Sequence, residues 1–209
     1  SNDDHVIVGI DDYPPWSYQE GELAKGIDVE LLQEVAKQLD IDIEFSFCFW
    51  SQCLEFMKTG EIDLLPNVYK LPERTTYMDF LEPSYLPGNV SSIYKLSTNK
   101  NDIENFEDLK GKSIGMQKGI IHFDRLANAT TLKKVDFDSN AQLMEALLSK
   151  EVDVIVGDKN VFDYLIASSQ TKYKAITRQR YEVFLNEPGY FAVSKCSNKR
   201  ELWQRMSQK

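Results

Sequence analysis

The sequence is poor in cysteine and in histidine. Its 209 residues contain three cysteines, Cys48, Cys53 and Cys196, and two histidines, His5 and His122. Neither set has the paired spacing of a zinc site, so we expect no metal centre and no cofactor. Cys48 and Cys53 are near enough to form a small-loop disulfide in an oxidising compartment, but two buried free thiols explain them equally well.

Long hydrophobic runs and basic clusters are also missing. No run approaches the roughly 18 consecutive apolar residues of a membrane-spanning helix. The 33 acidic residues outnumber 24 scattered basic ones, giving a net charge of -9 that argues against a nucleic-acid partner. The opening SNDDHVIVGI has no charged n-region followed by an apolar h-region, and we interpret it as a mature or engineered start.

Strand-length apolar runs alternate with segments of helical period along the chain. This pattern is typical of an α/β fold with largely parallel sheets. HVIVGI is the first expected strand, and IDVELLQEVAKQL is the first expected helix, with Asp28 as its N-cap. The apolar face of that helix comprises Val29, Leu32, Val35, Ala36 and Leu39. A second α/β series follows the run VSSIYKL, which indicates two lobes.

One segment of the first series is echoed in the second. QCLEFMKTGEIDLLPNV at 52–68 matches QLMEALLSKEVDVIVGD at 142–158 with a constant offset of 90 and four identities, among them Asp63 with Asp153. Four identities in 17 positions can also arise by chance. If the echo is real, each lobe carries the same helix–strand unit. Ligands of open α/β sheets bind beyond the carboxyl ends of strands, which indicates Arg74 and Asp158.

Arg74 and Asp158 together complement an α-amino acid. A guanidinium donates two parallel hydrogen bonds to a carboxylate, and a buried ammonium group requires an anion. Each residue also has a purely structural interpretation. Arg74 can pair with Glu73 or Asp79 on the surface, and Asp158 can cap the helix KNVFDYL.

Several stretches in order along the chain resemble one family. They are GEID…LPERTTYMDFLEPSY, which is highly specific, the less specific NFEDLKGKSIGMQKG, and then EVDVIVGD and GYFAVSK. They are similar to bacterial extracytoplasmic solute-binding proteins that serve amino-acid ABC transporters. The resemblance implies a type II periplasmic-binding-protein fold, with two lobes that close around a ligand. It places lobe 1 at 1–89 plus 187–209 and lobe 2 at 90–186, joined by two crossing strands.

The same resemblance implies a ligand site. Arg74 matches the arginine that binds the ligand carboxylate, and Asp158 matches the aspartate that binds the ammonium group. The aromatic wall around the ligand side chain comprises Tyr13, Trp50 and Trp16. Departures from the family pattern are Asn67 and Tyr69 in place of small hydroxyl residues, and Gly119-Ile120 in place of glycine followed by Thr or Ser. A backbone N–H there can still meet a carboxylate at a helix N-terminus. His122 and Asp124, just beyond, either contact the ligand or, as we expect, face solvent on the first turn of that helix.

We therefore expect a monomeric periplasmic protein that binds an α-amino acid or similar solute and contacts an ABC transporter permease. The alternative is the ligand-sensing ectodomain of a histidine kinase or cyclase, which a transmembrane segment beyond Lys209 would favour. A dehydratase-like enzyme is the third class. The expected site has no histidine near a nucleophile and no carboxylate pair, so we expect no catalysis.

Overall fold

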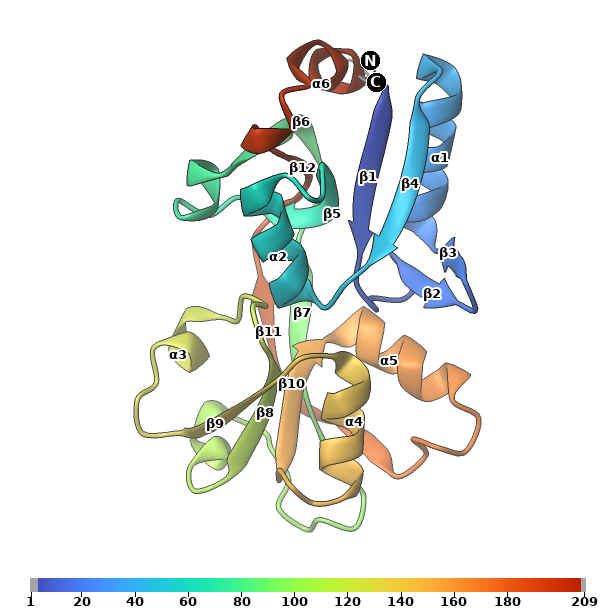
Figure 1. Cartoon of the computed structure of the whole chain (residues 1–209). Coiled ribbons are helices and arrows are strands. Elements are labelled where there is room, and N and C mark those ends of the chain that lie inside the picture. Colours follow the sequence, from blue (N-terminus) through green and yellow to red (C-terminus); the bar gives the residue numbers. More distant parts are fainter. Residues whose placement is uncertain (1–3, 208–209) are drawn as a thin grey trace. The chain divides into compact units, whose positions relative to one another are not determined.

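The computed structural model describes residues 4–207, and the chain divides into two compact units (Figure 1). Unit 1 comprises the described residues up to Gly88 and from Asn186 onward, and unit 2 comprises Asn89–Leu185. Residues 1–3, at the beginning of the opening SNDDHVIVGI, and residues 208 and 209 lie outside the described residues. No helix between residues 4 and 207 is both long and apolar enough to cross a membrane.

Unit 1 is built on a five-stranded sheet of order β4-β1-β5-β12-β6. Strand β1 pairs in parallel with β4 and β5, whereas β12 is antiparallel to β5 and β6. Its strands are β1 His5–Ile10, β4 Asp42–Phe47, β5 Leu64–Tyr69, β6 Met78–Leu86 and β12 Gly189–Ser194. The other elements are the hairpin β2 Tyr18–Glu20 and β3 Leu23–Lys25, the helices α1 Ile27–Leu39, α2 Trp50–Thr59 and α6 Arg200–Ser207, and the short helices η1 Arg74–Thr76 and η3 Lys195–Ser197.

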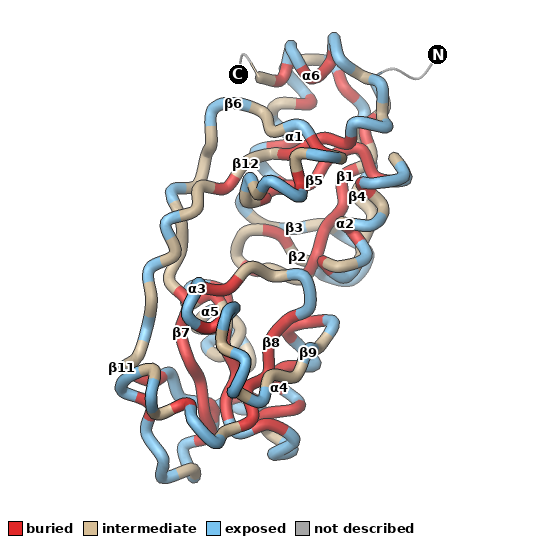
Figure 2. The backbone as a smooth tube through the Cα atoms, turned by 90° about the vertical axis from the view of Figure 1, so that its left-hand side faces the viewer, coloured by how far each residue is buried: buried red, intermediate tan, exposed pale blue. Residues whose placement is uncertain are grey.

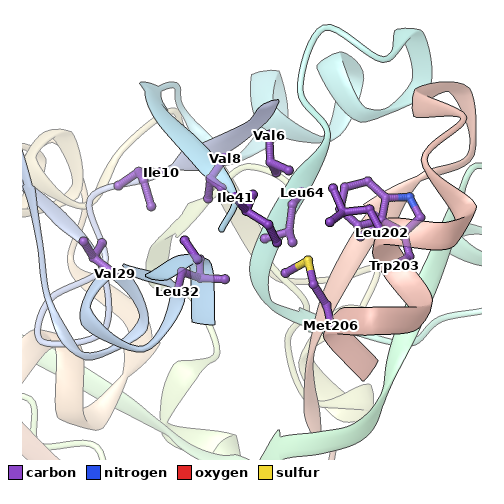
Figure 3. Packing of buried hydrophobic residues seen from close by; sticks show 12 residues of the cluster. Val6, Val8, Ile10, Val29, Leu32, Ile41, Leu64, Leu202, Trp203 and Met206 are labelled. Atoms are coloured by element: carbon purple, nitrogen blue, oxygen red, sulfur yellow. The ribbon is translucent and has the colours of Figure 1, made fainter. Parts of the chain in front are cut away.

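The core of unit 1 joins α1 and α6 to the sheet. Residues Val29 and Leu32 of α1 and Trp203 of α6 belong to one buried cluster with Val8 of β1 and Leu64 of β5 (Figure 3). The apolar face predicted for α1 is confirmed, because Val29, Leu32 and Ala36 are buried and Val35 and Leu39 pack against the cluster.

The N-terminus of α1 differs from the prediction. The N-cap is Gly26, with φ 116°, and Asp28 lies in the first turn with 1% of its surface exposed. Only glycine fits at position 26, because a Cβ there would lie 2.3 Å from the carbonyl oxygen of Trp16. The backbone N–H groups of Ile27 and Asp28 donate to the carbonyls of Pro15 and Trp16, at 3.1 and 2.8 Å. These bonds satisfy donors that a capping side chain would otherwise satisfy.

Unit 2 is built on a second five-stranded sheet, of order β11-β7-β10-β8-β9. Strand β8 is parallel to β9 and β10, and β7 is antiparallel to β10 and β11. Its strands are β7 Asn89–Leu96, β8 Ser113–Gln117, β9 Lys133–Phe137, β10 Val154–Asp158 and β11 Ile176–Leu185. Its helices are α3 Asp124–Ala127, α4 Asn140–Leu148, α5 Lys159–Ser168 and the short η2 Phe106–Leu109. Figure 2 shows β8 in red, and each of its residues is buried.

The sequence echo corresponds to equivalent structure in the two units. Helix α2 leads into β5 in unit 1, and α4 leads into β10 in unit 2. The carboxyl group of Asp63 accepts the backbone N–H of Ile7 at 2.8 Å, and that of Asp153 accepts the backbone N–H of Ser113 at 2.8 Å. Both aspartates therefore fasten the start of their strand to the neighbouring parallel strand.

The predicted α/β fold class is confirmed, with one difference in detail. Each sheet contains three parallel strands and two strands that run antiparallel to their neighbours, so the sheets are mixed. The strand pattern did not predict β6, β12 or the β2–β3 hairpin.

Cys48 and Cys53 form a disulfide, which resolves the two alternatives that the sequence left open. The bridge closes a loop of a few residues, for which loop entropy corresponds to about 2 kcal/mol of stabilisation. Cys196 is a free, exposed thiol.

Candidate functional site

Arg74 lies in η1, a short helix that follows β5 in unit 1. Only 4% of its surface is exposed, and its Nη1 donates a hydrogen bond to the carbonyl of Tyr69 at 3.2 Å. This bond turns the guanidinium back toward the end of β5. Burial lowers the pKa of Arg74, opposed by the nearby hydroxyl of Tyr77 and carboxylate of Glu73. Arg74 is therefore a largely desolvated cation, not an exposed surface arginine.

Trp50 lies against this cation. The guanidinium carbon of Arg74 is 5.8 Å from the centre of the Trp50 ring, within the range of a cation–π interaction. Trp50 is the first residue of α2 and lies between the two cysteines of the disulfide. The backbone N–H of Cys53 also donates to the carbonyl of Phe49 at 2.8 Å. The covalent bridge and this helical bond fix the backbone on both sides of Trp50.

Tyr13 and Trp16 belong to one tight turn after β1. The backbone N–H groups of Trp16 and Ser17 both donate to the carbonyl of Tyr13, each at 3.0 Å, and the N–H of Tyr13 donates to Ser17 at 2.7 Å. Both aromatic residues are half-buried. The first turn of α1 holds the same loop, through its bonds to Pro15 and Trp16.

Asn67 and Tyr69 lie at the carboxyl end of β5. Asn67 has a left-handed backbone with φ 53°, a conformation that asparagine tolerates better than most residues. Its Oδ1 would lie 2.4 Å from a Cβ at position 189, so the Asn67 side chain packs directly on Gly189 of β12. Tyr69 pairs with the same glycine across the strands.

Unit 1 gathers six predicted site residues at one edge of its sheet. The strands β1, β4 and β5 are parallel, so their carboxyl ends meet at the same edge. The residues that follow those ends are Tyr13 and Trp16 after β1, Trp50 after β4, and Asn67, Tyr69 and Arg74 at or after the end of β5. This edge can present one buried cation among aromatic and amide groups, which is the chemistry needed to bind a carboxylate.

Asp158 is the last residue of β10 in unit 2 and is 8% exposed. Its Oδ1 accepts the backbone N–H of Val161 at 3.0 Å, so Asp158 is the N-cap of α5. Its Oδ2 accepts a hydrogen bond from the side-chain amide of Asn89 at 2.7 Å. These two bonds hold the Asp158 carboxylate in place at the end of β10.

Gly119 and Ile120 form a turn after β8, which runs parallel to β10. Gly119 has φ 84°, and the N–H of Ile120 points back to the carbonyl of Gln117 at 3.4 Å. The expected helix N-terminus is not at this position, because α3 begins only at Asp124. A backbone donor aligned by a helix is therefore not available from Ile120.

His122 also differs from the prediction, because it is 8% exposed instead of facing solvent. Its Nε2 is buried without a hydrogen-bond partner, and burial, together with the charge of Lys134, lowers its pKa to about 4. The imidazole is neutral at physiological pH. The adjacent Asp124 is exposed, as expected.

Sequence reasoning missed two features near these residues. Asn89 is 69 residues from its partner Asp158, and no local pattern links them. Asp28 was placed at a helix cap, whereas it is a buried acid beside Tyr85. Within residues 4–207, no group of three or more His, Cys, Asp or Glu side chains is arranged to hold a metal ion.

The chain is similar to known proteins in sequence and in fold. The sequence profile of the bacterial extracellular solute-binding proteins, family 3, matches residues 6–136, and a second profile, described as NMT1/THI5 like, matches residues 89–206. A probable histidine-binding protein of Campylobacter jejuni is 27% identical over 161 residues, covering 75% of this chain and 60% of its own length. The chain spans about 60% of the length of the curated relatives it matches.

Solved structures show the same fold. An ancestral arginine-binding protein bound to arginine matches with a TM-score of 0.82 and 26% identity, covering 98% of this chain and 89% of that one. A histidine kinase sensor domain with similarity to periplasmic binding proteins matches with a TM-score of 0.78 and 21% identity, covering 98% of this chain and 87% of that one.

Proposed function

Because the chain belongs to the bacterial extracellular solute-binding proteins of family 3, we propose that it binds an α-amino acid or a close derivative for delivery to an ABC transporter. The observation that carries the proposal is the buried guanidinium of Arg74, 4% exposed at the carboxyl edge of three parallel strands. A guanidinium held in this way can donate two parallel, charge-assisted hydrogen bonds to a carboxylate with little competition from water.

In this proposal Arg74 binds the carboxylate of the solute and Asp158 binds its ammonium group. Trp50 contacts both the cation and the solute side chain, with Tyr13 and Trp16 completing the aromatic wall. Asn67 contributes an amide and Tyr69 a phenol group at the end of β5. The turn at Gly119 and Ile120 contributes backbone contacts from unit 2. The protein acts as a binding protein without catalysis or a cofactor.

Basic amino acids are the first solutes to consider. One similar protein is named for histidine, and a similar structure contains arginine. Asp11 and Asp12 follow β1 at the same sheet edge, and burial raises the pKa of Asp12. A carboxylate there would select a basic side chain. The Cys48–Cys53 disulfide supports an extracytoplasmic location, because such bonds persist in oxidising compartments.

A thermal-shift screen of the twenty amino acids, their deaminated analogues and small peptides tests the proposal. A solute that binds only the folded state stabilises it by about 2.7 kcal/mol at 100 times its Kd, which raises the melting temperature by several degrees. We expect L-arginine or L-histidine to give the largest shift. No shift from any amino acid at millimolar concentration would contradict the proposed function.

Replacing Asp158 by asparagine tests the ammonium contact. Asparagine caps helices as well as aspartate does, so the bond to Val161 is kept while the negative charge is lost. We expect the affinity for L-arginine to fall by about ten- to a thousandfold, and the affinity for 5-guanidinopentanoate, which lacks the α-amino group, to change little. Titration calorimetry measures both, with the exposed Asp124→Asn as the matched control. Equal losses for the two compounds would show that Asp158 does not bind the ammonium group.

A second candidate function is ligand sensing by a membrane receptor. The similarity to a histidine kinase sensor domain favours it, although that structure, at 21% identity, carries the fold alone. The two functions use the same solute site. They differ in whether the bound protein delivers its solute to a transporter or activates a signalling domain. The sequence of the complete gene separates them, since a sensor requires a membrane span and a signalling domain.

A further inference from the structure

Asp28 is a buried acid without an evident structural task. It lies in the first turn of α1 with 1% of its surface exposed, and neither carboxyl oxygen forms a hydrogen bond of normal geometry. The N-cap role expected from the sequence belongs to Gly26. A polar group buried in this way costs free energy, so its presence calls for an explanation.

The group that faces Asp28 is the hydroxyl of Tyr85, on β6. This hydroxyl is itself buried and lies beside both the Asp28 carboxyl and the backbone of Asn67. The Tyr85 ring is stacked on Phe191 of β12, with centroids 4.1 Å apart and planes 3° from parallel, which fixes its position. Tyr85 thus connects Asp28 to the strand end that carries Asn67.

The backbone of Asp28 is connected to the other aromatic loop of unit 1. Its N–H donates to the carbonyl of Trp16 at 2.8 Å, in the turn that Tyr13 begins. Asp28 therefore lies between two parts of the proposed solute site: its backbone N–H contacts the Tyr13–Ser17 turn, and Tyr85 lies between its carboxyl and the end of β5. Ionisation of the Asp28 carboxyl would therefore act on both the turn and the end of β5.

We infer that Asp28 is a positioning residue of the solute site and that binding of a solute carboxylate is coupled to protonation of Asp28. The inference rests on the proposed function and deepens it. It requires no direct contact between Asp28 and the solute. An ionised Asp28 would place a negative charge beside the part of unit 1 that receives the solute carboxylate. This charge would repel the carboxylate, and it would disturb the position of Tyr85 beside Asn67.

Burial makes this coupling effective near neutral pH. Desolvation raises the pKa of Asp28 to about 7, and Tyr85 opposes the shift. Among the described residues, no charged group of β3, β4 or α6, which also pack against α1, contributes to the shift. The acid is neutral below pH 7 and charged above it. A bound carboxylate raises this pKa further, so binding takes up a proton and affinity falls as pH rises.

Titration calorimetry with L-arginine at pH 6, 7 and 8 tests the coupling, because this solute has no group that titrates strongly in that range. We expect binding to be about three- to fivefold weaker at pH 8 than at pH 6, which corresponds to a ligand-induced rise in the Asp28 pKa of about 0.6 to one unit. Repeating the titration at pH 7.5 in buffers of different ionisation enthalpy should show uptake of a fraction of a proton per site.

Three variants make the result specific to Asp28. Asp28→Asn mimics the neutral acid and should bind equally well at pH 6 and pH 8 without proton uptake. Glu30→Gln removes the same charge from the exposed face of α1 and should keep the wild-type pH profile. Tyr85→Phe removes the group that opposes the pKa shift, and should move the midpoint of the profile to higher pH.

The possible results separate the coupling from the proposed function. Binding of L-arginine, L-histidine or another amino acid with a flat pH profile in the wild type would refute the coupling alone. The same holds if Asp28→Asn keeps the wild-type profile, or, should that variant not fold, if Tyr85→Phe leaves the midpoint unchanged. Absence of binding for every amino acid at every pH would refute the proposed function, and the coupling with it.

Discussion

Replacement of Arg74 by alanine is expected to weaken amino-acid binding by about 3 to 5 kcal/mol, the cost of leaving one partner of a buried charge pair alone. With 4% of its surface exposed, Arg74 would bind the solute carboxylate of the proposed site with little competition from water. Loss of the guanidinium also removes the cation above the Trp50 ring. Titration calorimetry measures the loss, and urea unfolding checks that the variant is folded.

Two further variants sharpen the Arg74 experiment. Lys70 lies between β5 and η1, and its side chain is 49% exposed. Lys70→Ala removes this positive charge and should leave the affinity for the amino acid nearly unchanged. Arg74→Lys keeps the charge but not the two parallel donors, and should lose a large part of the affinity. We do not expect Arg74→Ala to match the wild type in affinity, or to lose no more affinity than Lys70→Ala. Either result would show that Arg74 does not bind the solute.

The elements of the two units were largely predictable from local pattern. The alternation that predicts β1 and α1 depends on residues close in sequence, and one buried face reveals each element. The antiparallel strands β6 and β12 were not predicted. They pair with each other, and β12 also pairs with β5, more than a hundred residues away in sequence, so their register depends on contacts that no local window contains.

The candidate site was predictable to a different degree in each part. Arg74 was found because it follows the carboxyl end of a buried strand, where open α/β sheets bind ligands, and because it matches the arginine of the resembled family. Its burial and its contact with Trp50 became visible only in three dimensions. Asp28 shows the limit of local reasoning. An acid at the start of a helical pattern predicts an N-cap, whereas the close approach of Trp16 requires glycine at position 26 and leaves the acid in the interior.

Replacement of Asp28 by asparagine is expected to stabilise the folded protein at pH 8 by about 2 to 4 kcal/mol. The folded-state pKa of about 7 lies above the ordinary value of 3.8, so the folded protein holds an extra proton between these values. Its stability then falls as pH rises from about 4 to 7, and about three pKa units correspond to about 4 kcal/mol. Asparagine has no ionised form, so its advantage should be complete above pH 7 and absent near pH 4.

Urea unfolding at pH 4, 6 and 8 measures this effect, and a second buried acid of unit 1 supplies the contrast. The Asp63 carboxyl accepts the N–H of Ile7 at 2.8 Å and the hydroxyl of Ser197 at 2.6 Å, so Asp63→Asn should lower stability where Asp28→Asn raises it. The exposed Glu30→Gln should change little. A gain in Asp28→Asn that is equal at pH 4 and pH 8 would mean that the substitution improves packing or capping. A loss at pH 8 would mean that the ionised carboxylate is stabilised in the folded protein, and the physical basis for proton-coupled binding would fail with it.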